Sequence, residues 1–119
     1  MKRIMFIVIV CALACALATS CSSGPKPMYS WYEYDNASYK YLKNSDQESL
    51  DNLIKAYDKI IAKQSGTRGV VPPGVYADYG FVLIQANKPA EGKKMLMKES
   101  ELYPESSVFV NSVIRMIEK

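Results

Sequence analysis

Histidine is absent from the sequence. This absence excludes His-dependent catalytic triads, Cys–His pairs and most zinc sites. Phosphate-cradling motifs are also lacking, because Gly66 and Gly69 lie in a polar loop without the spacing or the lysine of a phosphate-binding loop. The formal net charge is only +3, whereas binding to nucleic acid would require a strongly basic face. We therefore expect no enzyme activity, no metal or cofactor site, and no nucleic-acid or small-molecule partner.

Cysteine is scarce, and all three cysteines lie within the first 21 residues. This part of the chain begins with Lys2 and Arg3, continues with an apolar run over 4–17, and ends in small residues before Cys21. A basic start, a short hydrophobic run and small residues are typical of a bacterial secretory signal. A membrane span needs about 18 to 20 apolar residues, so the run is too short for one. We predict a signal peptide over residues 1–20, with an uncleaved anchor as the alternative.

The residues that end at Cys21 resemble the lipobox of bacterial lipoproteins, in which this cysteine is acylated, for example with palmitate, and becomes the mature N-terminus. Leu is more usual three residues before the cysteine, where this chain has Ala18. Cys15 is a weaker second candidate because it would leave a very short hydrophobic run. Acyl chains bind a bilayer with about 0.8 kcal/mol per buried methylene. The resemblance implies lipidation of Cys21, and Ser22 after it resembles the signal for the outer membrane, periplasmic face. The alternative is an ordinary signal peptide.

Three segments follow before the centre of the chain. Residues 21–28 contain small residues and prolines, which predict an extended tether that does not pack. Residues 29–43 are dense in aromatic side chains and predict a helix, although aromatic residues also favour a strand. Ser45 and Glu48 have the spacing of a capping box, which predicts that Ser45 caps a helix running to Lys63.

The centre of the chain, residues 73–107, predicts two helices joined by a tight turn. Bulky and small residues there have the spacing of a tetratricopeptide repeat, namely Tyr76, Tyr79, Gly80, Leu83, Gly92, Leu96 and Pro104. Gly80 and Gly92 would let the helices approach closely. Glu99 stands where such repeats usually have a small residue. A buried carboxylate must be paired or hydrogen-bonded, so we expect Glu99 either to lie at the edge of the helix contact or to be held by a Tyr hydroxyl or by backbone donors near Ser106 and Ser107.

A final helix is predicted after Pro104, because an apolar stripe recurs there at helical spacing: Val110, Val113, Ile114 and Ile117. The predicted fold class is therefore all-α. We expect one domain over residues 29–119, a short tetratricopeptide-like array of about five antiparallel helices. Because arrays bury their faces only against neighbours, a partner that completes the array is a further hypothesis.

The combination of a lipobox with the runs YSWYEYDNASYKYL, VPPGVYADYGFVL and KESELYPESSVF resembles a family of small Gram-negative lipoproteins classed as a domain of unknown function. Trp31 is followed by Tyr32 where the family would have Gly. The resemblance implies a tetratricopeptide-like fold and genes placed beside a lipoprotein similar to the curli secretion channel. It thereby implies envelope proteins, including such a channel-like lipoprotein, as partners, and an accessory role at an outer-membrane secretion or assembly complex.

The leading functional prediction is a lipid-anchored protein-binding module whose concave face is the docking surface. By the geometry of such repeats, Ala77, Phe81 and Ile84 would face this groove, as would Tyr32, Asn36 and Tyr39 on the first helix. From these we select four partner-binding candidates: Tyr32, Tyr39, Phe81 and Ile84. Aromatic anchors often carry interface energy, but aromatic residues at helical spacing are also common in cores.

Two alternatives use the same sequence features. One is a pilotin-like carrier that escorts a channel subunit to the outer membrane through the lipid anchor. The other is an enzyme acting on cell-wall material through a carboxylate pair such as Glu99 and Glu101. The pair is disfavoured because neighbouring positions on a helix would point these side chains in different directions.

Overall fold

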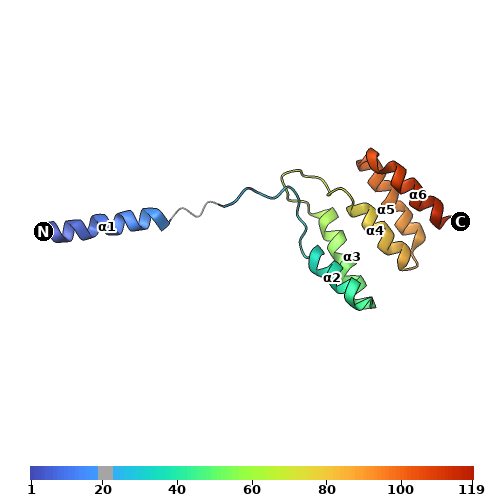
Figure 1. The fold of residues 1–119 in the computed structure, drawn as a ribbon, viewed down its shortest axis with the longest axis horizontal. Coiled ribbons are helices and arrows are strands. Elements are labelled where there is room, and N and C mark those ends of the chain that lie inside the picture. The colour runs from blue at the N-terminus through green and yellow to red at the C-terminus, as the bar shows by residue number, and fades with distance from the viewer. Residues whose placement is uncertain (19–22) are drawn as a thin grey trace.

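The computed structural model describes residues 1–18 and 23–119, the side chains of 13–18 excepted. The described residues form helices and no strand: α1 (Lys2–Ala18), α2 (Tyr34–Asn44), α3 (Gln47–Ala62), α4 (Val75–Gln85), α5 (Pro89–Leu102), the short 3₁₀ helix η1 (Pro104–Ser106) and α6 (Ser107–Ile117) (Figure 1). The predicted all-α class is confirmed. Cys21 and the predicted cleavage point before it lie outside the described residues.

The N-terminal helix α1 covers most of the predicted signal peptide. Among the described residues, no helix has both the length and the apolar character that a membrane crossing requires.

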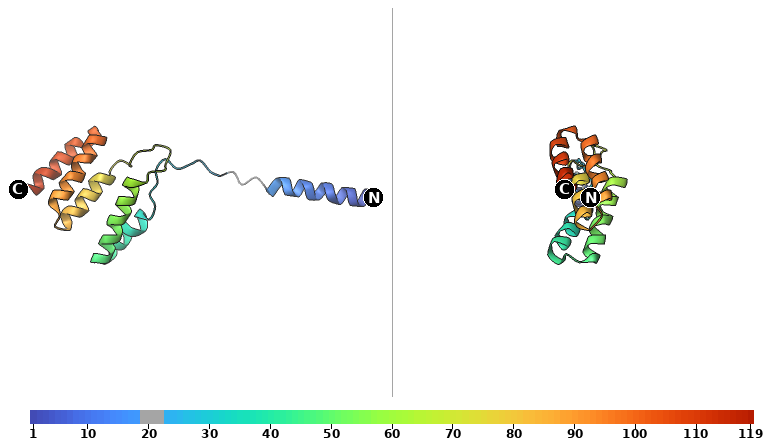
Figure 2. Two further views of the ribbon diagram at one scale, coloured as in Figure 1. Left: turned by 180° about the vertical axis from the view of Figure 1, so that it is seen from behind. Right: turned by 90° about the vertical axis from the view of Figure 1, so that its right-hand side faces the viewer.

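The helices after residue 29 pack as neighbours in chain order. Antiparallel hairpins are formed by α2 with α3 and by α4 with α5, while α3 also touches α4 and α6 packs on α5 (Figures 1 and 2). One core cluster runs through both hairpins and contains Leu53, Tyr57, Ile60 and Leu83. A second joins Leu96 of α5 to the apolar stripe of α6, including Val110 and Val113.

The tight approach of α4 and α5 occurs at two glycines. A Cβ atom on Gly80 would lie 2.7 Å from the carbonyl oxygen of Gly92, and one on Gly92 would lie 2.5 Å from that of Gly80. Real Cβ atoms do not come this close to backbone oxygen. The predicted role of these glycines is confirmed: any side chain here would push the two helices apart.

The start of α3 differs by one residue from the prediction. Asp46 is the N-cap, and its carboxylate accepts the N–H of Ser49 at 2.7 Å. Ser45 instead ends α2, in the left-handed region with φ 51°, and donates its N–H to the carbonyl of Tyr41 at 2.8 Å. Only Ser45 and Asp46 separate the two helices. Because Ser45 is the C-cap of α2, the N-cap of α3 is Asp46.

The aromatic segment becomes helical only from Tyr34, five residues later than predicted. The preceding residues are hydrogen-bonded to the loop after α3. The N–H groups of Thr67 and Arg68 donate to the carbonyls of Pro27 (3.0 Å) and Met28 (3.1 Å). Ser30 donates its N–H to the Gln64 side chain at 2.8 Å and accepts from that amide at 3.0 Å.

Gly66 makes this docking possible. A Cβ atom on Gly66 would lie 2.5 Å from the Cα of Tyr29 and would also overlap the carbonyl of Met28. We call residues 27–32 the docked segment. The end of the predicted tether, Pro27 and Met28, therefore packs against the domain, contrary to the expectation that the tether stays free.

Candidate functional site

Helix α4, which lies in the middle of the array, is held at its N-terminus by Glu99 of α5. The Glu99 side chain is only 2 % exposed, and its carboxylate accepts the N–H groups of Gly74 at 2.7 Å and Ala77 at 3.3 Å. First-turn N–H groups have no partner inside their own helix, and the helix dipole favours a negative charge there. Gly74, the N-cap of α4, has no side chain that could accept a hydrogen bond from these N–H groups.

The donors to Glu99 are therefore those of α4, not the predicted Tyr hydroxyl or the backbone near Ser106 and Ser107. Glu101, two residues later on the same helix, is exposed. The two carboxylates do not share an open cleft, and Glu99 is engaged in positioning α4.

Tyrosine side chains join the two hairpins through Asp78 of α4. The hydroxyls of Tyr34 on α2, at 2.7 Å, and of Tyr57 on α3 both donate to the Oδ2 atom of Asp78. The Tyr57 ring lies between its neighbours, with centroids 5.5 Å from Tyr34 and 4.8 Å from Tyr79, the latter pair stacked at 14°. Tyr79 in turn donates to Asp58 of α3 at 3.1 Å. These contacts fix α2, α3 and α4 relative to one another.

Burial is the main reason why these phenols hold their protons strongly. Burial and the bond to Asp78 raise the pKa of Tyr34 to about 12, and the same causes raise the pKa of Tyr57 further. Burial and the neighbouring Asp58 raise the pKa of Tyr79 to about 12. The hydroxyls of Tyr34 and Tyr57 therefore keep their protons at neutral pH and donate them to Oδ2 of Asp78 in hydrogen bonds.

Two pockets meet at Asp78 and Phe81. One, of about 540 Å³, lies between α4 and α6 and is lined by Gly74, Ala77, Asp78, Phe81, Phe109, Val113 and Met116. The other, of about 300 Å³, lies between α2 and α4 over α3 and is lined by Tyr34, Ser38, Tyr41, Leu42, Leu53, Tyr57, Asp78, Phe81, Val82 and Gln85. We call the two together the apolar groove. Phe81 is 50 % exposed between them.

The four predicted partner-binding residues do not lie on one surface. Phe81 lines both pockets, while Ile84 packs against the core cluster of α5 and α6. Tyr32 lies in the docked segment, donates its hydroxyl to the carbonyl of Lys63, and has the Lys59 ammonium 4.6 Å from its ring centroid. Tyr39 is 63 % exposed on α2 but lines neither pocket.

Tyr32 does not face the groove because the helix predicted over residues 29–43 begins only at Tyr34. It lies before the start of α2, with a φ of 49°, so a helical face does not include it. Residues that the sequence reasoning missed are Phe109 and Met116 of α6, which are 60 % and 65 % exposed and line the groove. Their spacing of seven residues places them on one helix face, which is a signal that could have found them.

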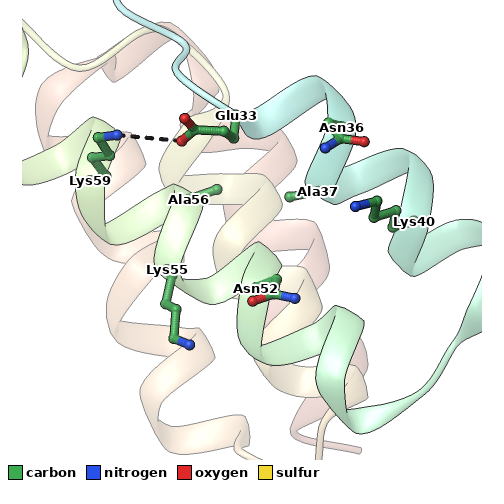
Figure 3. Close-up of a pocket in the computed structure, with 8 residues that line it drawn as sticks. All are labelled: Glu33, Asn36, Ala37, Lys40, Asn52, Lys55, Ala56 and Lys59. Carbon is green, nitrogen blue, oxygen red and sulfur yellow. Dashed lines mark hydrogen bonds and ion pairs between the residues drawn. The ribbon is translucent and has the colours of Figure 1, made fainter.

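A separate polar cleft of about 290 Å³ lies between α2 and α3 (Figure 3). It is lined by Glu33, Asn36, Ala37, Lys40, Asn52, Lys55, Ala56 and Lys59. Lys59 pairs with Glu33 at 3.4 Å, but both side chains are well exposed, and such surface pairs contribute little. Asn36, predicted to face the groove, lies here instead. Within 1–18 and 23–119 no group of three or more Cys, Asp or Glu side chains could hold a metal ion.

A family model described as Domain of unknown function (DUF4810) matches residues 28–113. No curated protein and no solved structure matches the chain. The matched range starts within the docked segment and includes α2, α3, α4 and α5, together with most of α6. Both pockets of the apolar groove therefore belong almost wholly to the family region.

Proposed function

The chain belongs to the DUF4810 family, and we propose that it is a lipid-anchored protein-binding module of the bacterial envelope. In this proposal Cys21 carries the lipid, the outer membrane is the site of anchoring, and the helical domain faces the periplasm. The apolar groove docks a protein of an outer-membrane secretion or assembly complex, such as a lipoprotein similar to the curli channel.

The observation that carries the proposal is the half-exposed Phe81 between two pockets. Contiguous exposed apolar surface is typical of interaction sites. Around Phe81 it includes Phe109, Met116 and, at the α2 side, Leu42, which is 80 % exposed. Burying such side chains against a partner would remove them from water, and central aromatic residues commonly dominate the binding energy.

The rigid surroundings of the groove also support a docking role. Phe81 lies on α4, which is held at its N-terminus by Glu99 and near its middle by the Gly80–Gly92 contact. The α2 wall is fixed by the bond from Tyr34 to Asp78. A surface held in this way loses little conformational entropy when it binds.

The docking surface can be tested by cross-linking in membranes, followed by purification of the native lipoprotein and mass spectrometry. We compare wild type with Phe81→Ala, and use Tyr39→Ala as the matched control, because Tyr39 is an exposed aromatic residue that lines neither pocket. We expect a channel-like lipoprotein to cross-link to wild type and to the control, and to be lost from Phe81→Ala. Equal recovery with all three proteins would contradict the proposed surface.

The anchor is tested separately by labelling cells with radioactive palmitate. Wild type should carry the label and fractionate with the outer membrane, while Cys21→Ser should lose both properties. The location of the cross-linked channel subunit in the Cys21→Ser strain then separates two roles. A stationary scaffold leaves that subunit in place, whereas a pilotin-like carrier leaves it mislocalised. Unchanged labelling of Cys21→Ser would exclude this residue as the lipid site.

A further inference from the structure

Asp78 is the charged residue in an otherwise uncharged groove. It lines both pockets, and the other side chains that line them are apolar or neutral. Phe81 follows it by three residues, so the carboxylate and the exposed ring lie on one face of α4, about 5–6 Å apart at their Cβ atoms. Any segment that covers Phe81 must also come close to Asp78.

The protein itself satisfies only part of this carboxylate. Tyr34 and Tyr57 both donate to Oδ2, and the hydrogen bonds formed within residues 23–119 include none to Oδ1. A carboxylate has room for about four hydrogen bonds. The ion pairs in the same part of the chain, Lys59 with Glu33 and Lys93 with Glu118, do not involve Asp78. The two phenols are neutral donors, so they position the charge without cancelling it.

This arrangement restricts what can occupy the groove. A wholly apolar partner would remove water from Asp78 and leave its charge unpaired, which is unfavourable. An acidic partner would add repulsion. A partner with a cation beside its apolar side chains would pair the charge in a site of lowered polarity, where such pairing discriminates between partners.

We propose that the apolar groove selects a protein segment in which a lysine or arginine lies within one helical turn of an aromatic or large aliphatic side chain, the cation pairing with Asp78 and the apolar group packing on Phe81. The inference rests on the proposed function and specifies the chemistry of its partner. Tyr34 and Tyr57 act as positioning residues that hold the carboxylate at the junction of the two pockets.

The test uses the full-length lipoprotein in detergent micelles and a phage-displayed library of random dodecapeptides. Asp78→Asn removes the charge, and Asp58→Asn is the matched control, because Asp58 also accepts a tyrosine hydroxyl but lines neither pocket. Wild type and the control should enrich peptides with Lys or Arg within four positions of an aromatic or aliphatic residue. Asp78→Asn should keep the apolar preference and lose the basic one.

Affinity measurements with one enriched synthetic peptide give a second readout. Replacing its basic residue by norleucine should weaken binding to wild type by about tenfold or more and should reduce the salt dependence. The same replacement should change little with Asp78→Asn. This peptide substitution tests the inference on the unmodified protein, so the result does not depend on how well Asp78→Asn folds.

Different failures have different meanings. The inference would be overturned if wild type enriched acidic or uncharged peptides, or if the norleucine replacement left the affinity unchanged. Loss of peptide binding in Phe81→Ala would in either case still support the groove as a docking surface. Equal binding of the enriched peptide to wild type and Phe81→Ala, or no enrichment by wild type, would overturn both the inference and the proposed function.

Discussion

In the α4–α5 hairpin two backbones touch at Gly80 and Gly92, whereas in the α2–α3 hairpin Ala37 and Ala56 face each other beside an open polar cleft (Figure 3). The first contact needs no side chain and lies within its own hairpin. The α2–α3 hairpin gains further support from outside itself, through the bonds of Tyr34 and Tyr57 to Asp78 and through the docked segment. Both hairpins share one apolar core, but only α4–α5 has direct backbone contact, whereas α2–α3 is also tied to α4 by tyrosine hydroxyls.

The largest expected effect comes from opening the close-packed hairpin with Gly92→Ala. The new Cβ would lie 2.5 Å from the Gly80 carbonyl oxygen and 2.6 Å from the Ile84 side chain, so α4 and α5 must separate. We expect a loss of about 3 kcal/mol in the free energy of unfolding, measured by urea denaturation. Gly24→Ala is the control, since a Cβ there meets nothing within 4 Å. An unchanged midpoint for Gly92→Ala would show that the helices are not held at this distance.

The next largest effect is expected from Glu99→Gln, which removes the charge that caps α4. An amide keeps one acceptor oxygen, but its NH₂ group would face a backbone N–H of α4. Buried hydrogen bonds to charged groups contribute about 2 kcal/mol, and we expect a loss of that size in urea denaturation. Glu101→Gln on the same helix is exposed and should change stability little. Equal effects of the two substitutions would contradict the capping role.

Tyr57→Phe tests the polar contacts of the other hairpin. It keeps the buried ring and deletes the hydroxyl that donates to Asp78. We expect a loss of about 1.5 kcal/mol in thermal or urea unfolding, because the hydrogen bond has a charged acceptor. Tyr39→Phe deletes an exposed hydroxyl and should be neutral. If both variants melt together with wild type, the α2–α3 hairpin does not depend on this bond.

The smallest and most selective effect is expected at alkaline pH. Folding raises the pKa of Tyr34 and Tyr79 from 10.0 to about 12. Above pH 10 the unfolded chain therefore loses protons that the folded chain keeps, so stability falls as pH rises from about 10 to about 12. Tyr34→Phe should make this fall shallower, as measured by urea midpoints across the range. The contrary result would be a fall of the same slope in Tyr34→Phe.

Local patterns were sufficient to predict much of the helical domain. Apolar periodicity located α3 and α6, and the two glycines predicted the contact between α4 and α5. Where the structure departs from prediction, the causes are contacts between distant parts of the chain. The start of α2 is set by residues 27–32 pairing with the loop after α3, and no periodicity within 29–43 reports that pairing.

The candidate site was only partly predicted, again because contacts between distant parts of the chain form much of it. The geometry of tetratricopeptide repeats predicts that Phe81 faces the groove, and in the structure Phe81 is 50 % exposed and lines both pockets. Tyr32 was placed by extending a helix that does not reach it, and Asp78 gained its importance from tyrosines on two other helices. The N–H groups that donate to the Glu99 carboxylate belong to Ala77 and Gly74, which lie 22 and 25 residues away in the chain. A local sequence pattern cannot report contacts over that distance.

The docked segment also shortens the free part of the tether between membrane and domain. With Cys21 as the anchored residue, as proposed, residues 22–26 are the chain left before Pro27 is held against the loop after α3. Fully extended, such a stretch reaches about 17 Å. The domain would therefore sample a thin layer next to the bilayer, where a partner anchored in the same leaflet is present at a high effective concentration. In that layer, a groove with modest intrinsic affinity would remain occupied.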